Sequence, residues 1–398
     1  MTEFKEFGLS NNLLIKIEDL GITKPTSIQE KSIPLIIEGK DVIGESATGS
    51  GKTLAFGSGI VEKVEPQAGI QALVLTPTRE LAQQVKESLK SFSYKRLKII
   101  TIFGGVSYTP QVADLSRADV VVATPGRLLD HLQRNNLDLS GIKILVLDEA
   151  DRMFDMGFIL DVEKIIRQCS KNRQTLFFSA TMPPKVKRLA DKYMKQPKSV
   201  SAVKYVDPKK LKQAYYQVPK NFKIALLLKL LNDQEAGLSM VFCNTRKNTD
   251  FVTQNLRLNK VRALAIHGGL SQNKRSGMIK MFNDANKGVL VCTDIAARGL
   301  HIDNVTHIFN YDLPFDATDY IHRIGRTARA GENGQVINLL SKYDYDNFSR
   351  ILRDNPEFQV KKIEKPYLER IQIVESVSTR PSRPNYRPNG NYSYRGRR

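Results

Sequence analysis

The sequence contains few cysteines and no long apolar run. Only three of its 398 residues are cysteines, and Cys169, Cys243 and Cys292 lie far apart without the spacing of metal ligands, which excludes a disulfide framework and a cysteine-based metal centre. The apolar stretch 224–228 ends at a lysine, so it is typical of a core helix and too short to span a membrane. Residues 1–6 carry charged side chains and lack the apolar core of a secretory signal. We therefore expect a cytoplasmic protein with buried, reduced thiols.

Acidic residues are scarce relative to basic ones. The chain has 61 lysines and arginines against 41 aspartates and glutamates, which gives a formal net charge of +20. Basic side chains that meet phosphates release condensed counterions, so this excess favours a polyanionic partner. A basic surface that only keeps the protein soluble is the alternative interpretation. The length of the chain is typical of two or three globular domains.

Short apolar runs alternate with amphipathic, helix-like segments along most of the chain. This rhythm predicts two successive α/β halves, each with a parallel sheet and crossover helices. The expected strands are 72–75, 99–103, 120–123, 144–147 and 175–178 in the first half, and 240–243, 263–266, 289–292, 307–310 and 335–339 in the second. A polar stretch with a proline, 203–210, is the expected linker between an N-terminal domain of residues 1–202 and a C-terminal domain of residues 211–365.

A glycine-rich segment in the first half predicts a phosphate site. The segment consists of Ser46, Ala47, Thr48, Gly49, Ser50, Gly51, Lys52 and Thr53. Its glycines allow backbone N–H groups to turn towards a phosphate, Lys52 can reach the outer phosphates, and Thr53 can hold Mg²⁺. The strict pattern has glycine where this chain has Ser46, a small residue that we interpret as a permitted variant. An ordinary strand-to-helix turn is the alternative.

Three carboxylates follow one of the expected buried strands. After the apolar run 144–147 the chain continues with Asp148, Glu149, Ala150 and Asp151. The carboxylates therefore emerge at the carboxyl end of the strand, where Asp148 can help to hold the metal and Glu149 can orient a water for attack on a terminal phosphate. Together with the phosphate loop, this pattern predicts nucleotide hydrolysis.

Further motifs follow in order, with Ser179-Ala180-Thr181 after the acidic box and the run HRIGRTARAG at residues 322–331. Over its folded length the chain resembles the DEAD-box RNA helicases of superfamily 2. The resemblance implies two tandem RecA-like α/β domains with the active site in the cleft between them, and ATP and Mg²⁺ as cofactors. It also implies that the hydroxyls of Ser179 and Thr181 couple the acidic box to domain closure.

The resemblance also implies how adenine is recognised. Segment 21–29 is similar to the family's Q motif, in which Gln29 would read adenine through its amide donor and acceptor. Phe4 would stack on the ring. Phe7 is a nearby alternative, and either aromatic side chain could belong to the core.

Two arginines of the second half have the spacing of the family's arginine fingers. Arg326 and Arg329 would stabilise negative charge that builds on the terminal phosphate. A structural pair of salt bridges is the alternative. Because both arginines belong to the second domain, the catalytic site would be complete only when the domains close.

Loops that follow the expected strands resemble the family's RNA track. The implied RNA-binding residues are Pro77, Thr78, Arg79, Gly104, Gly105, Thr124, Pro125, Gly126 and Arg127 in the first domain, and His267, Gly268, Thr293, Arg298 and Gly299 in the second. Hydroxyl, N–H and guanidinium groups at such positions grip phosphates without reading bases. Any one of these loops alone is more typical of a turn.

Two positions depart from the family pattern. His301 stands where the family usually has an aspartate that meets the ATP ribose, so we expect altered nucleotide affinity. Ala328 replaces the usual glycine between the arginine fingers. Its methyl group is tolerable in a helical backbone, so both arginines keep their implied role.

The end of the chain, residues 366–398, has a different composition from the rest. From residue 376 onward it has six arginines interleaved with tyrosines, prolines and asparagines, and no acidic residue. Such a segment cannot bury a core, and we expect it to be disordered. Arginines on phosphates and tyrosines on bases would make it an accessory RNA-binding tail, and a passive solubilising tail is the alternative.

These observations together predict an RNA helicase that depends on ATP and Mg²⁺, binds single-stranded RNA, and locally unwinds short duplexes or remodels RNA–protein complexes. The alternatives are an RNA clamp with little unwinding, a DNA-directed helicase of the same superfamily, and a non-catalytic nucleic-acid-binding protein. The intact Lys52, Asp148 and Glu149 argue against the last of these. We expect a monomer, and both ribosome assembly and RNA decay are compatible pathways.

Overall fold

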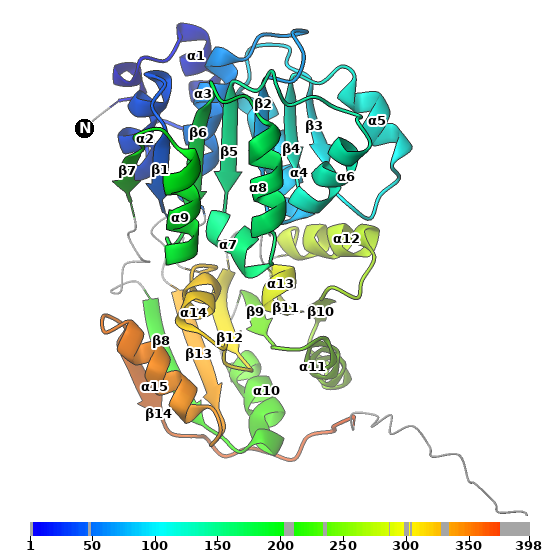
Figure 1. The fold of residues 1–398 in the computed structure, drawn as a ribbon. Helices are drawn as coiled ribbons and strands as arrows, with labels where there is room; N and C mark the ends of the chain where they lie inside the picture. The colour runs from blue at the N-terminus through cyan, green and yellow to red at the C-terminus, as the bar shows by residue number, and fades with distance from the viewer. Residues whose placement is uncertain are drawn as a thin grey trace, which may run out of the picture.

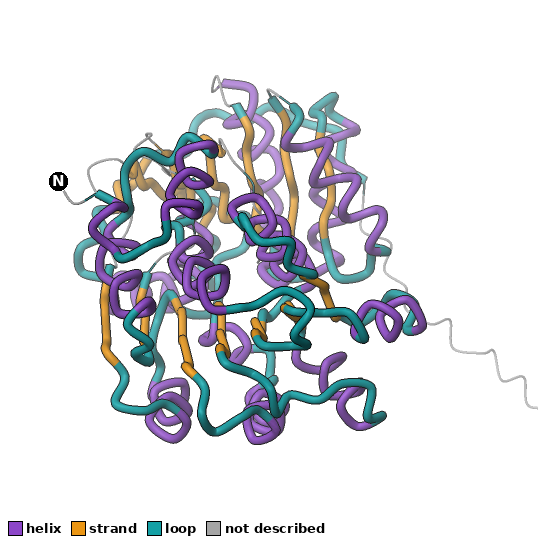
Figure 2. The backbone as a smooth tube through the Cα atoms, turned by 90° about the horizontal axis from the view of Figure 1, so that it is seen from above, coloured by secondary structure: helices purple, strands orange, loops and turns teal. Residues whose placement is uncertain are grey.

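Two parallel β-sheets organise the chain into two lobes, which lie one above the other in Figure 1. The computed structural model describes residues 3–46, 49–202, 211–233, 237–285, 287–297, 302, 305–327 and 334–374. We call residues 3–202 the first lobe and residues 211–374 the second lobe. The expected linker, 203–210, and the chain from residue 375 onward lie outside the described residues. Helices flank the strands on both sides (Figure 2), as the alternation of apolar runs and amphipathic segments predicts.

The first lobe contains a seven-stranded parallel sheet in the order β3-β4-β2-β5-β6-β1-β7. Its strands are β1 (Val42–Glu45), β2 (Ala72–Leu75), β3 (Ile99–Ile102), β4 (Val120–Ala123), β5 (Ile144–Asp148), β6 (Gln174–Ser179) and β7 (Lys198–Ser201). Every residue of β2, β4, β5 and β6 is buried. Helices cover these strands on both faces, which explains their continuous apolar runs.

The helices of the first lobe pack in two apolar layers. One layer joins the sheet to α1–α4 and the other joins it to α5–α9. The helical elements are η1 (Phe4–Phe7), α1 (Asn11–Asp19), α2 (Ser27–Ile37), α3 (Lys52–Lys63), α4 (Arg79–Phe92), α5 (Thr109–Leu115), α6 (Pro125–Gln133), α7 (Ala150–Asp155), α8 (Ile159–Gln168) and α9 (Pro184–Tyr193). Because parallel strands end at the same edge, the loops that begin α3, α4, α6 and α7 gather at one edge of the sheet.

The second lobe repeats this plan with a seven-stranded parallel sheet in the order β10-β11-β9-β12-β13-β8-β14. Its strands are β8 (Leu211–Gln217), β9 (Leu238–Phe242), β10 (Ala263–Ile266), β11 (Gly288–Cys292), β12 (Val305–Asn310), β13 (Gly334–Leu340) and β14 (Val360–Ile363). The helical elements are η2 (Lys220–Phe222), α10 (Lys223–Asp233), α11 (Arg246–Leu258), α12 (Gln272–Asn283), α13 (Asp294–Ala297), α14 (Ala317–Ile324) and α15 (Tyr345–Asp354).

All the expected strands are confirmed within a few residues at their ends, and the structure adds β1, β7, β8 and β14. The strands β7 and β14 lie at the edge of their sheets and expose most of their side chains, so they lack a continuous apolar run. The three cysteines are free and buried, as expected, and burial raises the pKa of the Cys169 thiol to about 12. Among the described residues, no helix combines the length and the apolar character needed to cross a membrane.

Residues 364–374 form an extended segment along the second lobe, which we call the strap (Figure 1). Leu368 and Ile371 of the strap pack against the apolar cluster that contains α10 and α11. The Val374 N–H donates to Asn255 Oδ1 at 2.8 Å, and Asn259 Nδ2 donates to the carbonyl of Gln372 at 2.9 Å. The described chain therefore keeps contact with the lobe as far as Val374, past the boundary expected at residue 365.

Candidate active site in the cleft between the lobes

A cavity of ≈ 820 Å³ lies between the two lobes, and several of the residues expected to bind nucleotide line it. The first lobe contributes residues of the phosphate loop, the start of α4 and the acidic box, and the second lobe contributes one face of α12. The residues that line it include Gln29, Gly49, Gly51, Lys52, Thr53, Asp148 and Glu149 from the first lobe, and Ile279, Lys280, Asn283 and Asp284 from the second. In Figure 1, α12 lies between the lobes.

The phosphate loop connects β1 to α3 through backbone that favours glycine. Gly49 and Gly51 have φ values of 82° and 89°, and a Cβ atom at Gly51 would collide with the Gln29 amide. Gly51 caps the amino end of α3 without a side-chain hydrogen bond, and such helix ends bind anions through their free N–H groups. Ala47 and Thr48 lie outside the described residues.

Ser46 and Lys52 hold the base of this loop. Ser46 is buried, its N–H donates to the carbonyl of Ser179 at 2.9 Å, and its hydroxyl accepts from Ser50 Oγ at 2.9 Å. The buried Lys52 Nζ donates to the carbonyl of Ser46 at 3.2 Å. The serine that departs from the strict motif thus ties the loop to the end of β6.

Gln29 lies against the phosphate loop, and its recognition of adenine stays a prediction. Its Oε1 accepts from the Thr26 N–H at 2.8 Å, and its Nε2 donates to the carbonyl of Gly51 at 3.1 Å. One amide hydrogen and one lone pair remain for a ligand. Phe4 and Phe7 pack edge to face in the core of the first lobe, and neither is among the residues that line the cavity. Stacking of Phe4 on adenine stays a prediction.

The two catalytic carboxylate candidates occupy different electrostatic environments. Asp148 ends β5, and Glu149 follows it with a φ of 53°, a value that is uncommon for a residue other than glycine. Burial raises the pKa of Asp148 to about 6, although Lys52 opposes the rise. Burial acts on Glu149 as well, but the positive charges of Arg152, Lys52 and Arg326 together outweigh it and lower the pKa of Glu149 to about 2.

The two carboxylates also differ in their partners. Glu149 forms a buried ion pair with Arg152 of α7, a residue that the sequence analysis did not single out. Asp148 Oδ1 is buried, and it has no hydrogen-bond partner within the described part of the chain. Glu149 is therefore held ionised, whereas Asp148 presents an unused oxygen.

The Ser179-Ala180-Thr181 segment binds the acidic box through Asp151. The Asp151 N–H donates to Ser179 Oγ at 3.0 Å, and Asp151 Oδ2 accepts from both the N–H and the hydroxyl of Thr181, at 2.9 and 2.8 Å. The hydroxyls of Ser179 and Thr181 thus contact the acidic box, as the resemblance implies. Their coupling role stays a prediction.

The second lobe places Arg326 beside this site. Arg326 is buried, and its charge helps to lower the pKa of Glu149 across the cleft. The second expected finger, Arg329, lies outside the described residues, as do Arg298, Gly299 and the two departures His301 and Ala328.

A fully buried arginine of the 322–331 motif, to which the sequence analysis gave no role of its own, holds α14 in place. Arg323 Nε and Nη2 donate to the two carboxylate oxygens of Asp294 at 2.6 and 2.7 Å. Its Nη1 donates to Asn310 Oδ1 at 3.0 Å, and its Nη2 donates to Asn244 Oδ1 at 2.8 Å. Because Arg326 follows one turn later, Arg323 fixes the position from which Arg326 reaches the cleft.

In the first lobe, the expected RNA residues gather around the start of α4. Thr78 caps this helix, and its Oγ1 accepts from the Leu81 N–H at 3.3 Å. Gly105 has a φ of 74°, and a Cβ atom there would overlap the Arg79 guanidinium. Arg79 and Arg127 both lie within 4 Å of the position that a Cβ atom would take at Gly104. Pro77 follows β2, Thr124 follows β4, and Pro125 and Gly126 begin α6.

In the second lobe, the expected RNA residues lie at the ends of β10 and β11. His267 Nε2 is 3.0 Å from Asp250 Oδ1, and His267 Nδ1 accepts from the Gly269 N–H at 3.1 Å. The guanidinium of Arg246, which the sequence analysis missed, lies against Gly268. Thr293 begins the turn into α13 at the end of β11.

An ion pair between the lobes connects the two groups of RNA residues. Arg275 of α12 lies 3.0 Å from Glu80 of α4, and both side chains are mostly buried. Burial and the charges of Arg275 and Arg127 lower the pKa of Arg79, while Glu80 opposes them. Arg79, Arg127 and Arg275 therefore form a cluster of positive charge across the cleft. Sequence motifs had pointed to Arg79 and Arg127 but not to Arg275.

Family models match most of the chain. The DEAD/DEAH box helicase model matches residues 26–189, and the helicase conserved C-terminal domain model matches residues 222–331. The chain is 40% identical over 370 residues to the ATP-dependent RNA helicase CshA of Listeria monocytogenes, and the aligned region covers 92% of this chain and 71% of the relative. It is 43% identical over 357 residues to the DEAD-box ATP-dependent RNA helicase CshA of Geobacillus kaustophilus, and this alignment covers 89% of this chain and 76% of the relative.

Two solved structures have the same arrangement of lobes. Dbp5 of S. cerevisiae bound to RNA and ADP BeF3 is 30% identical, with a TM-score of 0.83 over 92% of this chain and 96% of that chain. Mss116p bound to ssRNA and AMP-PNP is also 30% identical, with a TM-score of 0.82 over 92% of this chain and 79% of that chain.

The network around Arg323 generates a stability prediction. We expect Arg323→Ala to lower the free energy of unfolding by about 3–5 kcal/mol, because it leaves the mostly buried Asp294 without its charge partner. Urea denaturation with a probe in the second lobe measures the effect. The control Arg353→Ala removes an exposed arginine of α15 and should change the free energy by about 0.5 kcal/mol at most. Equal stabilities of the two variants would contradict the role given to Arg323.

Proposed function

This chain belongs to the DEAD/DEAH box helicase family and is an ATP-dependent RNA helicase, and we propose that its lobes form one ATP site that RNA completes. The observation that carries the proposal is the placement of Arg326. Its charge acts on Glu149 of the other lobe, at a cavity that both lobes line. A first lobe alone would bind nucleotide but would lack this charge.

We propose that the first lobe binds ATP through the phosphate loop and Gln29. The left-handed glycines and the free amino end of α3 are suited to the phosphates, and Lys52 neutralises their outer oxygens. The remaining donor and acceptor of Gln29 are suited to the edge of adenine.

The residues present fit a magnesium ion. Asp148 Oδ1 has no partner among the described residues, Thr53 lines the same cavity, and oxygen ligands are those that Mg²⁺ prefers. The raised pKa of Asp148 also indicates a buried carboxylate whose desolvation the charge of Lys52 only partly offsets. We propose that Asp148 and Thr53 hold the ion, which when bound supplies neutralisation of the phosphate charge.

We propose that Glu149, which the surrounding positive charges keep ionised, accepts a hydrogen bond from the attacking water and so orients it. Arg152 holds the Glu149 carboxylate, and Arg326 stabilises the charge that develops on the terminal phosphate. Arg329 is assigned a similar role by its spacing alone.

We propose that RNA closes the cleft through the cluster of Arg79, Arg127 and Arg275. These arginines repel one another and attract phosphates, so an RNA backbone lying across them favours the arrangement in which Arg326 reaches Glu149. Ser179 and Thr181 transmit the state of the acidic box through Asp151. The monomeric state, the cytoplasmic location and a role in ribosome assembly or RNA decay stay predictions.

The dependence of ATP hydrolysis on RNA tests this function. We expect single-stranded RNA to stimulate steady-state hydrolysis, and Glu149→Gln to reduce the stimulated kcat by about 10²-fold or more while nucleotide binding remains. Glu38→Gln, an exposed change in the same lobe, is the control and should hydrolyse ATP like the wild type. A rate that is the same with and without RNA, or an undiminished rate for Glu149→Gln, would contradict the proposal.

The ion pair of Glu149 predicts a pH dependence. Arg152 lowers the pKa of Glu149, so Arg152→Met should raise it, by about one unit or more. Carbon-13 NMR titration of the Glu149 carboxyl group measures this pKa directly. The acid limb of ATP hydrolysis does not report it, because Asp148, with a pKa of about 6, loses its charge first as the pH falls. Arg188→Met, an exposed change on α9, should leave the Glu149 titration in place. Superimposable Glu149 titrations for the two variants would show that Arg152 does not control Glu149.

A further inference from the structure

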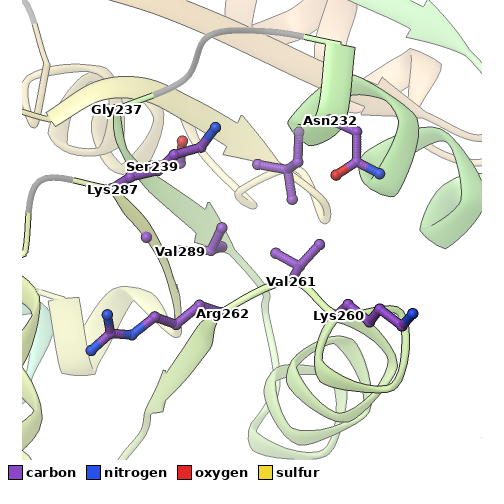
Figure 3. A pocket seen from close by; sticks show the side chains of 10 residues that line it. Asn232, Gly237, Ser239, Lys260, Val261, Arg262, Lys287 and Val289 are labelled. Atoms are coloured by element: carbon purple, nitrogen blue, oxygen red, sulfur yellow. The ribbon is translucent and has the colours of Figure 1, made fainter.

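A second cavity lies in the second lobe, at the opposite end of the sheet from the RNA loops. Its volume is ≈ 390 Å³, and it lies at the amino ends of β9 and β11, between α10 and the end of α11 (Figure 3). Helix α11 begins at Arg246, beside the RNA loop at Gly268, and ends near this cavity. A helix of 13 residues spans about 20 Å. The cavity, which we call the distal pocket, is therefore separate from the cleft.

Positive charge surrounds the distal pocket. Lys260, Arg262 and Lys287 all line it and are exposed, and Figure 3 shows them around its rim. Among the described residues that line the pocket there is no aspartate or glutamate. Three exposed cations at the rim of a small cavity, whose described lining contains no carboxylate, make the local potential positive and favour an anion.

A buried hydroxyl in the wall of the pocket lacks a partner. Ser239 of β9 lines the pocket, is 1% exposed, and its Oγ has no hydrogen-bond partner in the described part of the chain. Buried polar groups are almost always hydrogen-bonded, and an unsatisfied one costs stability. A ligand with a polar group at this position would recover that hydrogen bond.

The other residues that line the pocket indicate which further groups a ligand would have. Leu231, Val261 and Val289 form an apolar surface, and the Asn232 amide adds a donor and an acceptor beside it. A nucleotide unit has a phosphate for the cations, a flat base face for the apolar surface and polar edges for an amide. An acidic side chain of a peptide carries one charge and has no such face. The volume lies within the range of about 300–1,000 Å³ that is usual for small-ligand sites.

The course of the strap connects the distal pocket with RNA. The strap ends at Val374, which hydrogen-bonds to Asn255 near the end of α11, and Asn259 next to Lys260 binds the strap as well. The following residues include the six arginines of the tail and, from residue 376, no acid. The basic end of the chain thus leaves the lobe beside the basic pocket, so both can meet the same polyanion.

We propose that the distal pocket binds a phosphate-bearing nucleotide unit of RNA that extends beyond the cleft. The proposal rests on the proposed function in one respect, which is that the polymer bound in the cleft is RNA. A second contact on the same strand acts at high effective concentration once the cleft has bound, so it adds affinity for long RNA and none for short RNA.

Charge neutralisation in the full-length protein tests the proposal. The variant Lys260→Gln/Arg262→Gln/Lys287→Gln changes the pocket, and Lys212→Gln/Lys361→Gln/Lys362→Gln removes the same charge from exposed positions of β8 and β14, far across the sheet. Binding of single-stranded RNAs of about 10 and about 40 nucleotides is measured with a non-hydrolysable ATP analogue. We expect the pocket variant to bind the long RNA about tenfold more weakly than the control variant. For the pocket variant, the slope of log K against log salt concentration should become less steep by about 0.7 for each phosphate contact that is lost.

Short RNA separates this proposal from the general function. Both variants should bind the short RNA equally and show equal ATP hydrolysis with it. Wild-type protein that short RNA fails to stimulate would contradict the proposed function. If short RNA stimulates ATP hydrolysis normally but the pocket variant binds long RNA as tightly as the control variant, only the role of the distal pocket would be overturned.

Ser239→Ala distinguishes a binding role from a structural one. The change removes a hydroxyl without an internal partner, so the free energy of unfolding should stay level or rise slightly. We expect the affinity for long RNA to fall several-fold, and unchanged RNA binding would count against the proposal. Uridine 5′-monophosphate and an aspartate-rich peptide are titrated in parallel. Two outcomes would overturn the assignment to RNA. In the first, the pocket binds the free nucleotide but the pocket variant binds long RNA as the control does. In the second, the pocket binds the peptide and not the nucleotide.

Discussion

The burial of Asp148 and Glu149 side by side is the constraint on which the rest of the structure depends. Two carboxylates at the end of one buried strand are costly unless positive charge surrounds them. Lys52 and Arg152 supply this charge from within the first lobe, and Arg326 supplies it from the second. The electrostatics of the site are therefore shared between two lobes that fold around separate sheets. This sharing makes hydrolysis sensitive to how the lobes are arranged.

Other contacts extend this dependence away from the carboxylates. Asp151 connects the acidic box to Thr181, and the buried Arg323 fixes the end of α14, just before Arg326. Glu80 and Arg275 pair across the cleft next to the arginines that we assign to RNA. An RNA backbone and the phosphates of ATP are both anions that this basic cleft would bind, so each favours the arrangement that the other needs.

Local patterns predicted most of the strands and the motifs, but long-range contacts could not be read from the sequence. The apolar run before Asp148 predicted a buried strand that ends in carboxylates, and β5 is that strand. The partners Arg152 and Arg275 were missed because nothing in their local sequence marks them, and only the fold brings Arg275 to Glu80. The distal pocket was missed for the same reason, since its lining comes from α10, β9 and β11 and from the segment after α11.

The contribution of Arg326 to hydrolysis tests the split site most directly. The measurement is the RNA-stimulated kcat of Arg326→Ala, together with its affinity for a fluorescent ATP analogue. The account predicts that kcat falls by about 10³-fold or more, because the second lobe no longer stabilises the charge on the phosphate, while nucleotide affinity changes little. A stimulated kcat within a few-fold of the wild type would contradict it.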